Sequence, residues 1–96
     1  MKGTPSLRSF IFAFADEAGA VGRGLGTHPS DVRVTCVHKG SALHVTASDG
    51  EMSGWPLHES IYRIGSINPR FIEGVSVAIR GAIAAELGRL SGRGAA

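Results

Sequence analysis

The side chains that could bind a metal ion are few and are spread along the chain. The 96 residues include four histidines and one cysteine, which are His28, His38, His44, His58 and Cys36. A structural zinc site needs about four converging ligands. In the hairpin predicted below, Cys36 and His38 lie on one face of a strand, while His44 projects to the opposite face. We therefore expect neither a metal site nor a bound cofactor.

The sequence also lacks the common spacings of catalytic residues. It contains no GxSxG, HExxH or Walker-type motif. His58 and Glu59 are adjacent, so their side chains diverge on a helix or a strand. The glycine-rich stretch GRGLG at 22–26 falls at the end of a predicted helix, where it is typical of a C-terminal cap and lacks the helix N-terminus that binds phosphate. We predict that the protein is not an enzyme.

Composition indicates one small domain over residues 1–96, with 91–96 expected to be a frayed tail. Hydrophobic residues make up 43% and charged residues 19% of the chain, which is typical of a globular protein. The net charge is only +2 and basic residues form no run. A single cysteine cannot form an intrachain disulfide and favours a reducing, cytoplasmic setting. Asp16 and Glu17 interrupt the first apolar stretch, which argues against a signal peptide or a membrane span.

Two helices are predicted from apolar residues spaced three and four apart. The first begins at the cap pair Thr4–Pro5 and is ended by Gly22, Gly24 and Gly26, and the last begins at Asn68–Pro69. The expected apolar faces consist of Leu7, Phe10, Ile11, Phe14, Ala18, Val21 and Leu25 in the first helix, and of Ile72, Val75, Ile79, Ile83, Leu87 and Leu90 in the last.

The segment between the helices predicts a three-stranded antiparallel meander. Val32, Val34 and Cys36 alternate with Arg33, Thr35 and Val37, and Lys39–Gly40 is a plausible two-residue turn. With that turn, Cys36 lies opposite Leu43, on the core face. The fold class is therefore α+β, in the order helix, three strands, helix, with both helices on one face of the sheet.

A second hairpin turn is predicted at Asp49–Gly50. This turn places Met52 on the core face and Trp55 beside His44 on the other face. Pro56 limits the third strand to an edge of the sheet. The spacing of Leu57, Ile61 and Ile64 predicts a helical turn or two within residues 57–66, with a strand as the alternative.

The face of the sheet away from the helices is the expected partner-binding surface. Its predicted members are Arg33, Thr35, His44, Thr46, Ser53 and Trp55. We expect Arg33, Thr35, His44 and Trp55 to form the contact patch, because tryptophan and arginine are enriched at binding hot spots. In the alternative interpretation, Trp55 packs beneath residues 57–66 as part of a satellite core.

A stripe of small residues runs along the last helix. Its members are Gly74, Ala78, Gly81, Ala85 and Gly88, which share one helix face. Each interior glycine costs about 1 kcal/mol relative to alanine, so the stripe needs an explanation in packing. We predict that it is the interface of a homodimer. The alternative is a contact with the first helix of the same chain, through Ala15, Ala18 and Gly19.

The predicted order of elements is shared by double-stranded-RNA-binding domains, which place a lysine-rich motif at the start of the last helix. Here residues 68–73 read NPRFIE, with Arg70 as the one basic residue, and the Lys39–Gly40 turn is shorter than that family's loop. The order also loosely resembles the small dimeric nucleoid proteins of the YbaB type. Both resemblances rest on element order alone, which does not assign a function.

We therefore expect a binding protein that inhibits or regulates a larger bacterial or phage complex by direct contact. Small size and the lack of catalytic motifs are typical of phage anti-defence proteins, such as anti-CRISPR proteins. One alternative is a nucleic-acid-binding module that uses Arg33, Lys39 and the arginines of the last helix. Another is a structural subunit of a homo-oligomeric assembly. A protein partner and a second copy of the chain are expected, and a membrane is not.

Overall fold

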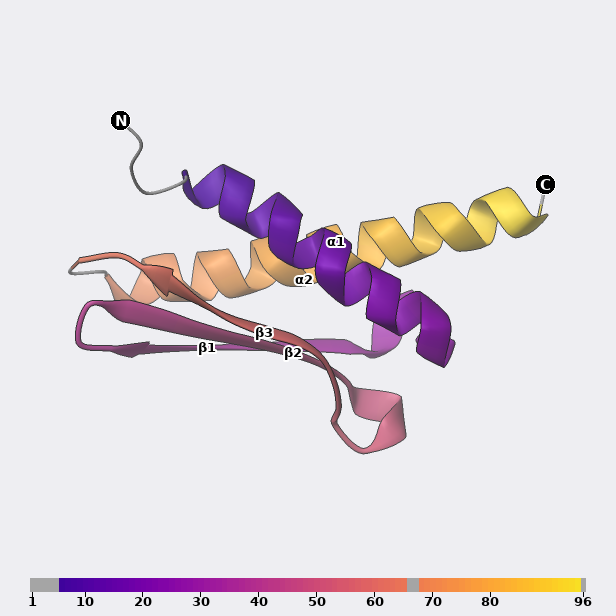
Figure 1. Cartoon of the computed structure of the whole chain (residues 1–96), viewed down its shortest axis with the longest axis horizontal. Helices are drawn as coiled ribbons and strands as arrows, with labels where there is room; N and C mark the ends of the chain where they lie inside the picture. The colour runs from indigo at the N-terminus through magenta and orange to yellow at the C-terminus, as the bar shows by residue number, and fades with distance from the viewer. Residues whose placement is uncertain (1–5, 66–67, 96) are drawn as a thin grey trace.

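Two helices cover one face of a three-stranded antiparallel sheet, as the sequence predicts (Figure 1). The computed structural model describes residues 6–65 and 68–95. The sheet has the strand order β1-β2-β3. The elements are α1 (Leu7–Leu25), a 3-10 turn (Pro29–Asp31), β1 (Val32–Lys39), β2 (Ala42–Asp49), a second 3-10 turn (Gly50–Met52), β3 (Trp55–Arg63) and α2 (Pro69–Ala95).

The helices begin and end at residues suited to capping. The Ser6 hydroxyl accepts a hydrogen bond from the backbone N–H of Ser9 at the start of α1. The predicted cap Thr4–Pro5 lies outside the described residues. Gly26, with a φ of 76°, ends α1 in the left-handed conformation. At α2, the Asn68 side chain accepts from the N–H of Arg70, which confirms the predicted start of that helix.

The first hairpin turn consists of Gly40 and Ser41, one residue later than predicted. Strand β1 continues to Lys39, which pairs with Ala42. Gly40 has a φ of 60°, a conformation that glycine adopts readily at the first position of a two-residue hairpin turn.

The later turn displaces the strand register by two residues. Cys36 lies opposite Val45, not Leu43 as predicted. Because side chains alternate with a period of two, an even displacement leaves each residue on its predicted face of the sheet.

The second hairpin turns directly after Asp49, near the predicted place, but residues 50–54 form the connection, so the predicted two-residue turn Asp49–Gly50 is wrong. The Asp49 carboxylate instead accepts hydrogen bonds from the N–H groups of Glu51 and Met52 and caps a 3-10 turn. Met52, predicted in the core, is exposed. Ser53, predicted on the third strand, follows this turn in the left-handed conformation. The backbone of Gly50 lies against the Arg33 side chain, and a Cβ at that position would collide with it.

Residues 57–63 belong to strand β3 and form no helical turn. Ala47 pairs with His58 and Ser48 pairs with Pro56, so Leu57 has no partner on β2. This extra residue is a β-bulge, which changes the alternation of side chains along the strand. Strand β3 lies at the edge of the sheet, as Pro56 predicts.

The core lies between the sheet and the helices. Its largest fully buried apolar side chains are Phe14, Leu43, Ile79, Ile83, Val32 and Val45. The predicted apolar faces are otherwise confirmed, but Val21 is exposed, and the Leu90 side chain lies outside the described part of the chain. Helix α1 approaches α2 through its own glycines. A Cβ at Gly19 would lie 2.8 Å from Cγ of Glu86, and one at Gly22 would lie 3.3 Å from Cδ2 of Leu87.

Candidate binding surface

The sheet face opposite the helices is uncovered by any described element (Figure 1). We call it the open face. The pairing of the strands arranges its side chains in rows that cross all three strands. From one end to the other, these rows are Arg33–Ser48–Pro56, Thr35–Thr46–Glu59, Val37–His44–Ile61 and Lys39–Ala42–Arg63.

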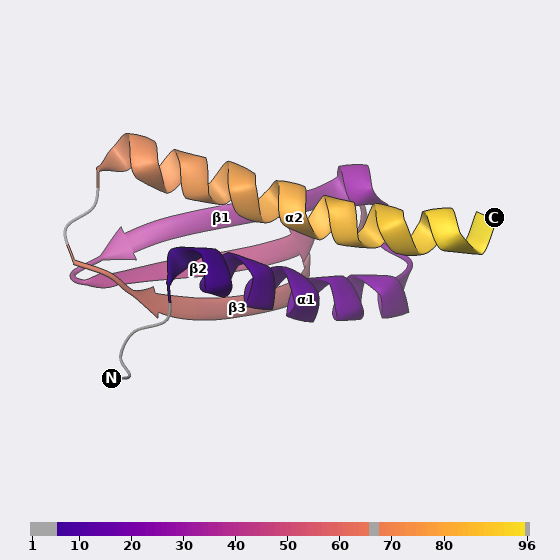
Figure 2. The same ribbon diagram turned by 90° about the horizontal axis from the view of Figure 1, so that it is seen from above.

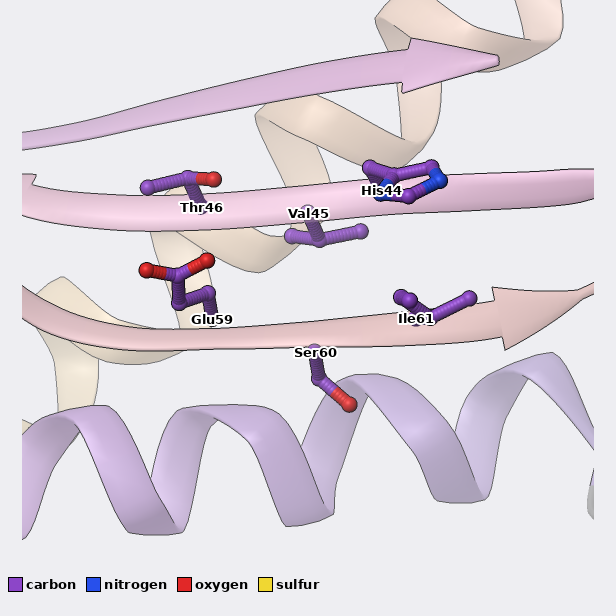
Figure 3. Close-up of a pocket in the computed structure, with 6 residues that line it drawn as sticks. All are labelled: His44, Val45, Thr46, Glu59, Ser60 and Ile61. Atoms are coloured by element: carbon purple, nitrogen blue, oxygen red, sulfur yellow. The ribbon is translucent and has the colours of Figure 1, made fainter. Parts of the chain in front are cut away.

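One row of the open face is apolar and solvent-exposed. Val37 and Ile61 expose 43% and 53% of their surface, on either side of the half-buried His44. Figure 3 shows His44, Thr46, Glu59 and Ile61 projecting from the same side of β2 and β3. An open depression of about 320 Å³ lies among them. Aliphatic groups beside hydrogen-bonding groups suit contact with another macromolecule.

Charge on the open face is unevenly distributed. The rows contain three cations, Arg33, Lys39 and Arg63, and one carboxylate, Glu59. The net charge of these rows is +2, which equals the net charge of the whole chain, so the charges of all other residues cancel. The open face therefore carries the chain's excess of basic groups, placed at its ends and not along its centre.

Three of the four predicted contact residues lie together on the open face. Arg33, Thr35 and His44 occupy successive rows. The predicted neighbourhood of Trp55 and His44 is wrong, because Trp55 lies opposite Asp49 and His44 lies opposite Ile61. Six residues of strand separate Trp55 from Ile61, which corresponds to about 20 Å.

Two members of the open face were missed by sequence reasoning. The alternation along the first strand places Val37 opposite the core residues, but Val37 was left out of the predicted surface. Ile61 was assigned to the apolar side of a helical turn. Assigning β3 as a strand as far as Arg63 would have placed Ile61 among the exposed positions.

Trp55 is 53% exposed and takes no part in the core cluster, which rules out the alternative of a satellite core beneath residues 57–66. We expect Trp55→Ala to change the free energy of unfolding by less than about 1 kcal/mol, as for other surface substitutions. Urea denaturation followed by circular dichroism measures this. A loss of about 3–5 kcal/mol, typical of a buried aromatic, would contradict the exposed placement.

The small-residue stripe of α2 lies on the solvent side of the helix layer. Gly74, Ala78, Gly81 and Ala85 are exposed, and a Cβ at Gly74 or Gly81 would meet no atom within 4 Å. The alternative of a contact between this stripe and α1 is therefore wrong. Ala15 and Ala18 of α1 are buried, but Gly19 beside them approaches Glu86, which lies outside the stripe.

The outer surface of the helices combines the stripe with exposed apolar side chains. Phe71 and Val77 are 45% and 65% exposed. A depression of about 330 Å³, lined mainly by apolar groups, lies between the N-terminal turns of α1 and α2, with Gly74 and Ala78 in its wall. Gly88, the last member of the stripe, is half-buried, and a Cβ at this position would lie 4.0 Å from Cγ of Pro29. The use of this stripe as an interface between copies stays a prediction.

The histidines lie in separate places and have separate structural contacts. His28 accepts from the N–H of Ser30, His38 contacts the Gly65 carbonyl, and the His58 ring packs edge-on against Phe14. Among residues 6–65 and 68–95, no three histidine, cysteine, aspartate or glutamate side chains are grouped so that they could hold a metal ion.

Cys36 is half-buried and lies against α2. Burial raises the pKa of its thiol, and a hydrogen bond with Ser76 acts in the opposite direction. The thiolate, which is the nucleophilic form, is therefore disfavoured. This environment is that of a packed side chain.

No protein-family model matches this sequence, and comparisons with curated proteins and with solved structures give no match. None of the described helices is both long and apolar enough to cross a membrane.

Proposed function

We propose that this protein acts by direct contact with another protein, and that the open face of the sheet is its contact surface. The observation that carries the proposal is the exposed row Val37–His44–Ile61 on a face that no described element covers. Val37 and Ile61 are about half exposed, so burying the rest of each side chain contributes about 1 kcal/mol. The arginines at the ends of the face add groups that are enriched in interfaces.

The partner in this proposal is a larger bacterial or phage complex, which the protein inhibits or regulates. A 96-residue chain can act in this way by occupying a surface that the complex needs, without chemistry of its own. An anti-defence protein, such as an anti-CRISPR protein, is the most specific form of the proposal.

A nucleic acid is the second candidate partner, because the open face carries three cations and one carboxylate. Phosphate contacts would come from Arg33, Lys39 and Arg63. Two arginines of α2 have other contacts, since Arg80 donates to the Val32 carbonyl at the edge of β1 and Arg89 pairs with Glu86.

Capture from a bacterial lysate on the tagged protein distinguishes the two partners. The proposal predicts a protein that stays bound after nuclease treatment and at raised salt, and whose activity falls when the free chain is added. Phosphate-driven binding would instead weaken steeply with salt. Recovery of nucleic acid alone, lost at raised salt, would contradict the proposal and support the second candidate.

A further inference from the structure

The two edges of the sheet differ in how their backbone groups are satisfied. At the β1 edge, Nε of Arg80 donates to the Val32 carbonyl at 3.1 Å, and the Ser76 hydroxyl donates to the Val34 carbonyl at 3.2 Å. Both donors come from α2, which lies beside β1 in Figure 2. Side chains that occupy outward carbonyls protect an edge strand from pairing with another chain. The β1 edge is therefore occupied by α2 at Val32 and Val34.

The β3 edge has no such protection in the described part of the chain. The Ile64 N–H donates to the Ser41 carbonyl at 2.8 Å. Ser41 and Ile64 are therefore a hydrogen-bonded pair at the end of the β2–β3 ladder. In an antiparallel ladder, hydrogen-bonded and non-hydrogen-bonded pairs alternate. The backbone groups of Glu59, Ile61 and Arg63 therefore point away from β2, toward the free edge.

The hydrogen bonds at β1 give the same assignment of inward-facing and outward-facing residues in β3. The outward carbonyls of Val32 and Val34 place the pair Val34–Ala47 among the non-hydrogen-bonded pairs of β1 and β2. The backbone groups of Ala47 then face β3 and bond its partner His58. His58 and Ser60 therefore bond inward, and the residues between them bond outward.

The free edge also carries two charged side chains without an ion-pair partner among the described residues. Glu59 and Arg63 are both exposed, and the one ion pair in the described part of the chain is Arg89–Glu86. The two side chains stand four residues apart on one strand face, about 13 Å from each other, with Ile61 midway between them. They are too distant to pair within one chain.

We propose that a second copy of this chain docks on the β3 edge, antiparallel and centred on Ile61, to form a continuous six-stranded sheet. A two-fold axis at Ile61 places Glu59 of each copy opposite Arg63 of the other. The two unpaired charges then form two cross-strand ion pairs. This register also pairs the backbone, because the outward N–H and C=O groups of Glu59, Ile61 and Arg63 meet those of Arg63, Ile61 and Glu59 in the other copy.

The geometry around the axis suits this pairing. Ile61 of one copy meets Ile61 of the other, which joins the two exposed apolar rows into one that crosses six strands. Pro56, which has no N–H to donate, lies outside the segment 59–63 that pairs. Helix α1 rests on β3 through Phe14, which contacts His58, and Phe10, which contacts Tyr62. It occupies the helix layer and leaves β3 at the margin of the sheet (Figure 2).

Charge reversal tests the pairing. Glu59→Arg and Arg63→Glu each replace two attractive pairs in the dimer with two repulsive pairs, so each is expected to raise the dimer dissociation constant on the order of 10- to 100-fold. The double variant Glu59→Arg/Arg63→Glu restores opposite charges and is expected to return the constant to within about threefold of the original. Sedimentation equilibrium over a dilution series measures all of these.

Matched controls separate this interface from others. Glu73→Arg makes the same charge change on the exposed face of α2 and is expected to leave dimerisation unchanged. Amide hydrogen exchange gives an independent readout, since the N–H groups of Glu59, Ile61 and Arg63 should become protected as the concentration rises. A protein that stays monomeric, or a dimer insensitive to both single reversals, would overturn the proposal. The proposal does not depend on the proposed function, which lysate capture tests separately.

Discussion

Replacing Asp49 with alanine is expected to lower the free energy of unfolding by about 3 kcal/mol. Asp49 is 1% exposed, and its carboxylate accepts hydrogen bonds from the Thr27 hydroxyl and from the N–H groups of Glu51 and Met52. Thr27 follows the C-terminal cap of α1 and is itself buried. The substitution would leave its hydroxyl without a partner and remove the cap of the 3-10 turn before β3.

Glu51→Ala is the control for this prediction. It removes the same charge from the same turn, but at an exposed position, and should change the free energy of unfolding by no more than about 0.5 kcal/mol. Urea denaturation followed by circular dichroism measures both variants. If Asp49→Ala cost less than about 1 kcal/mol, this carboxylate would not join α1 to the end of β2 as the hydrogen bonds indicate.

Leucine substitutions should have opposite effects at two glycines of the helix layer. Gly19 is buried where α1 packs on α2, and a Cβ added at this position would collide with the Glu86 side chain. Gly19→Leu is expected to separate the helices and cost about 3 kcal/mol or more. Gly81 has open space around it, so Gly81→Leu is expected to raise helix propensity and stabilise the chain by up to about 1 kcal/mol.

Thermal unfolding and light scattering of both variants together test these expectations. A fully stable Gly19→Leu variant would contradict the close contact between α1 and α2. If Gly81→Leu converted a dimer to a folded monomer, the stripe of α2 would be the dimer interface, and the β3 edge would not. A Gly81→Leu protein that remains dimeric and stable would show that the stripe faces solvent.

Element order and helix faces were predictable because they depend on local signals. The spacing of Phe14 and Ala18, and of Ile79 and Ile83, identified the buried helix faces. The faces of β1 and β2 were also assigned correctly although the first turn was misplaced, because a register error of two residues preserves the alternation. The choice between Lys39–Gly40 and Gly40–Ser41 depended on which turn position required the positive φ of Gly40.

Strand β3 was less predictable because a bulge disturbs its pattern. Leu57 and Tyr62 are both buried, yet they are five residues apart, a spacing that regular alternation forbids on one face. The unpaired Leu57 accounts for this. Without the bulge, the spacing of Leu57, Ile61 and Ile64 looked helical, and Ile61 was placed inside when it is exposed.

The roles of the glycines were not predictable from their spacing. The seven-residue recurrence of Gly74, Gly81 and Gly88 drew attention to α2, whereas the glycines in close helix contact are Gly19 and Gly22 of α1. Gly50 lies in a turn as predicted, but it also makes room for the Arg33 side chain. Such requirements come from tertiary neighbours, which a local pattern does not reveal.

Binding of a protein partner by the open face of the sheet is tested most directly by one pair of variants. Val37→Arg places a charge in the apolar row of the open face, and Val77→Arg makes the same change on the outer face of α2, where valine is 65% exposed. Both variants should fold as the original protein does. In lysate capture, we predict that Val37→Arg loses the partner at least tenfold while Val77→Arg keeps it. Retention by Val37→Arg with loss by Val77→Arg would place the contact surface on the helices and contradict the claim.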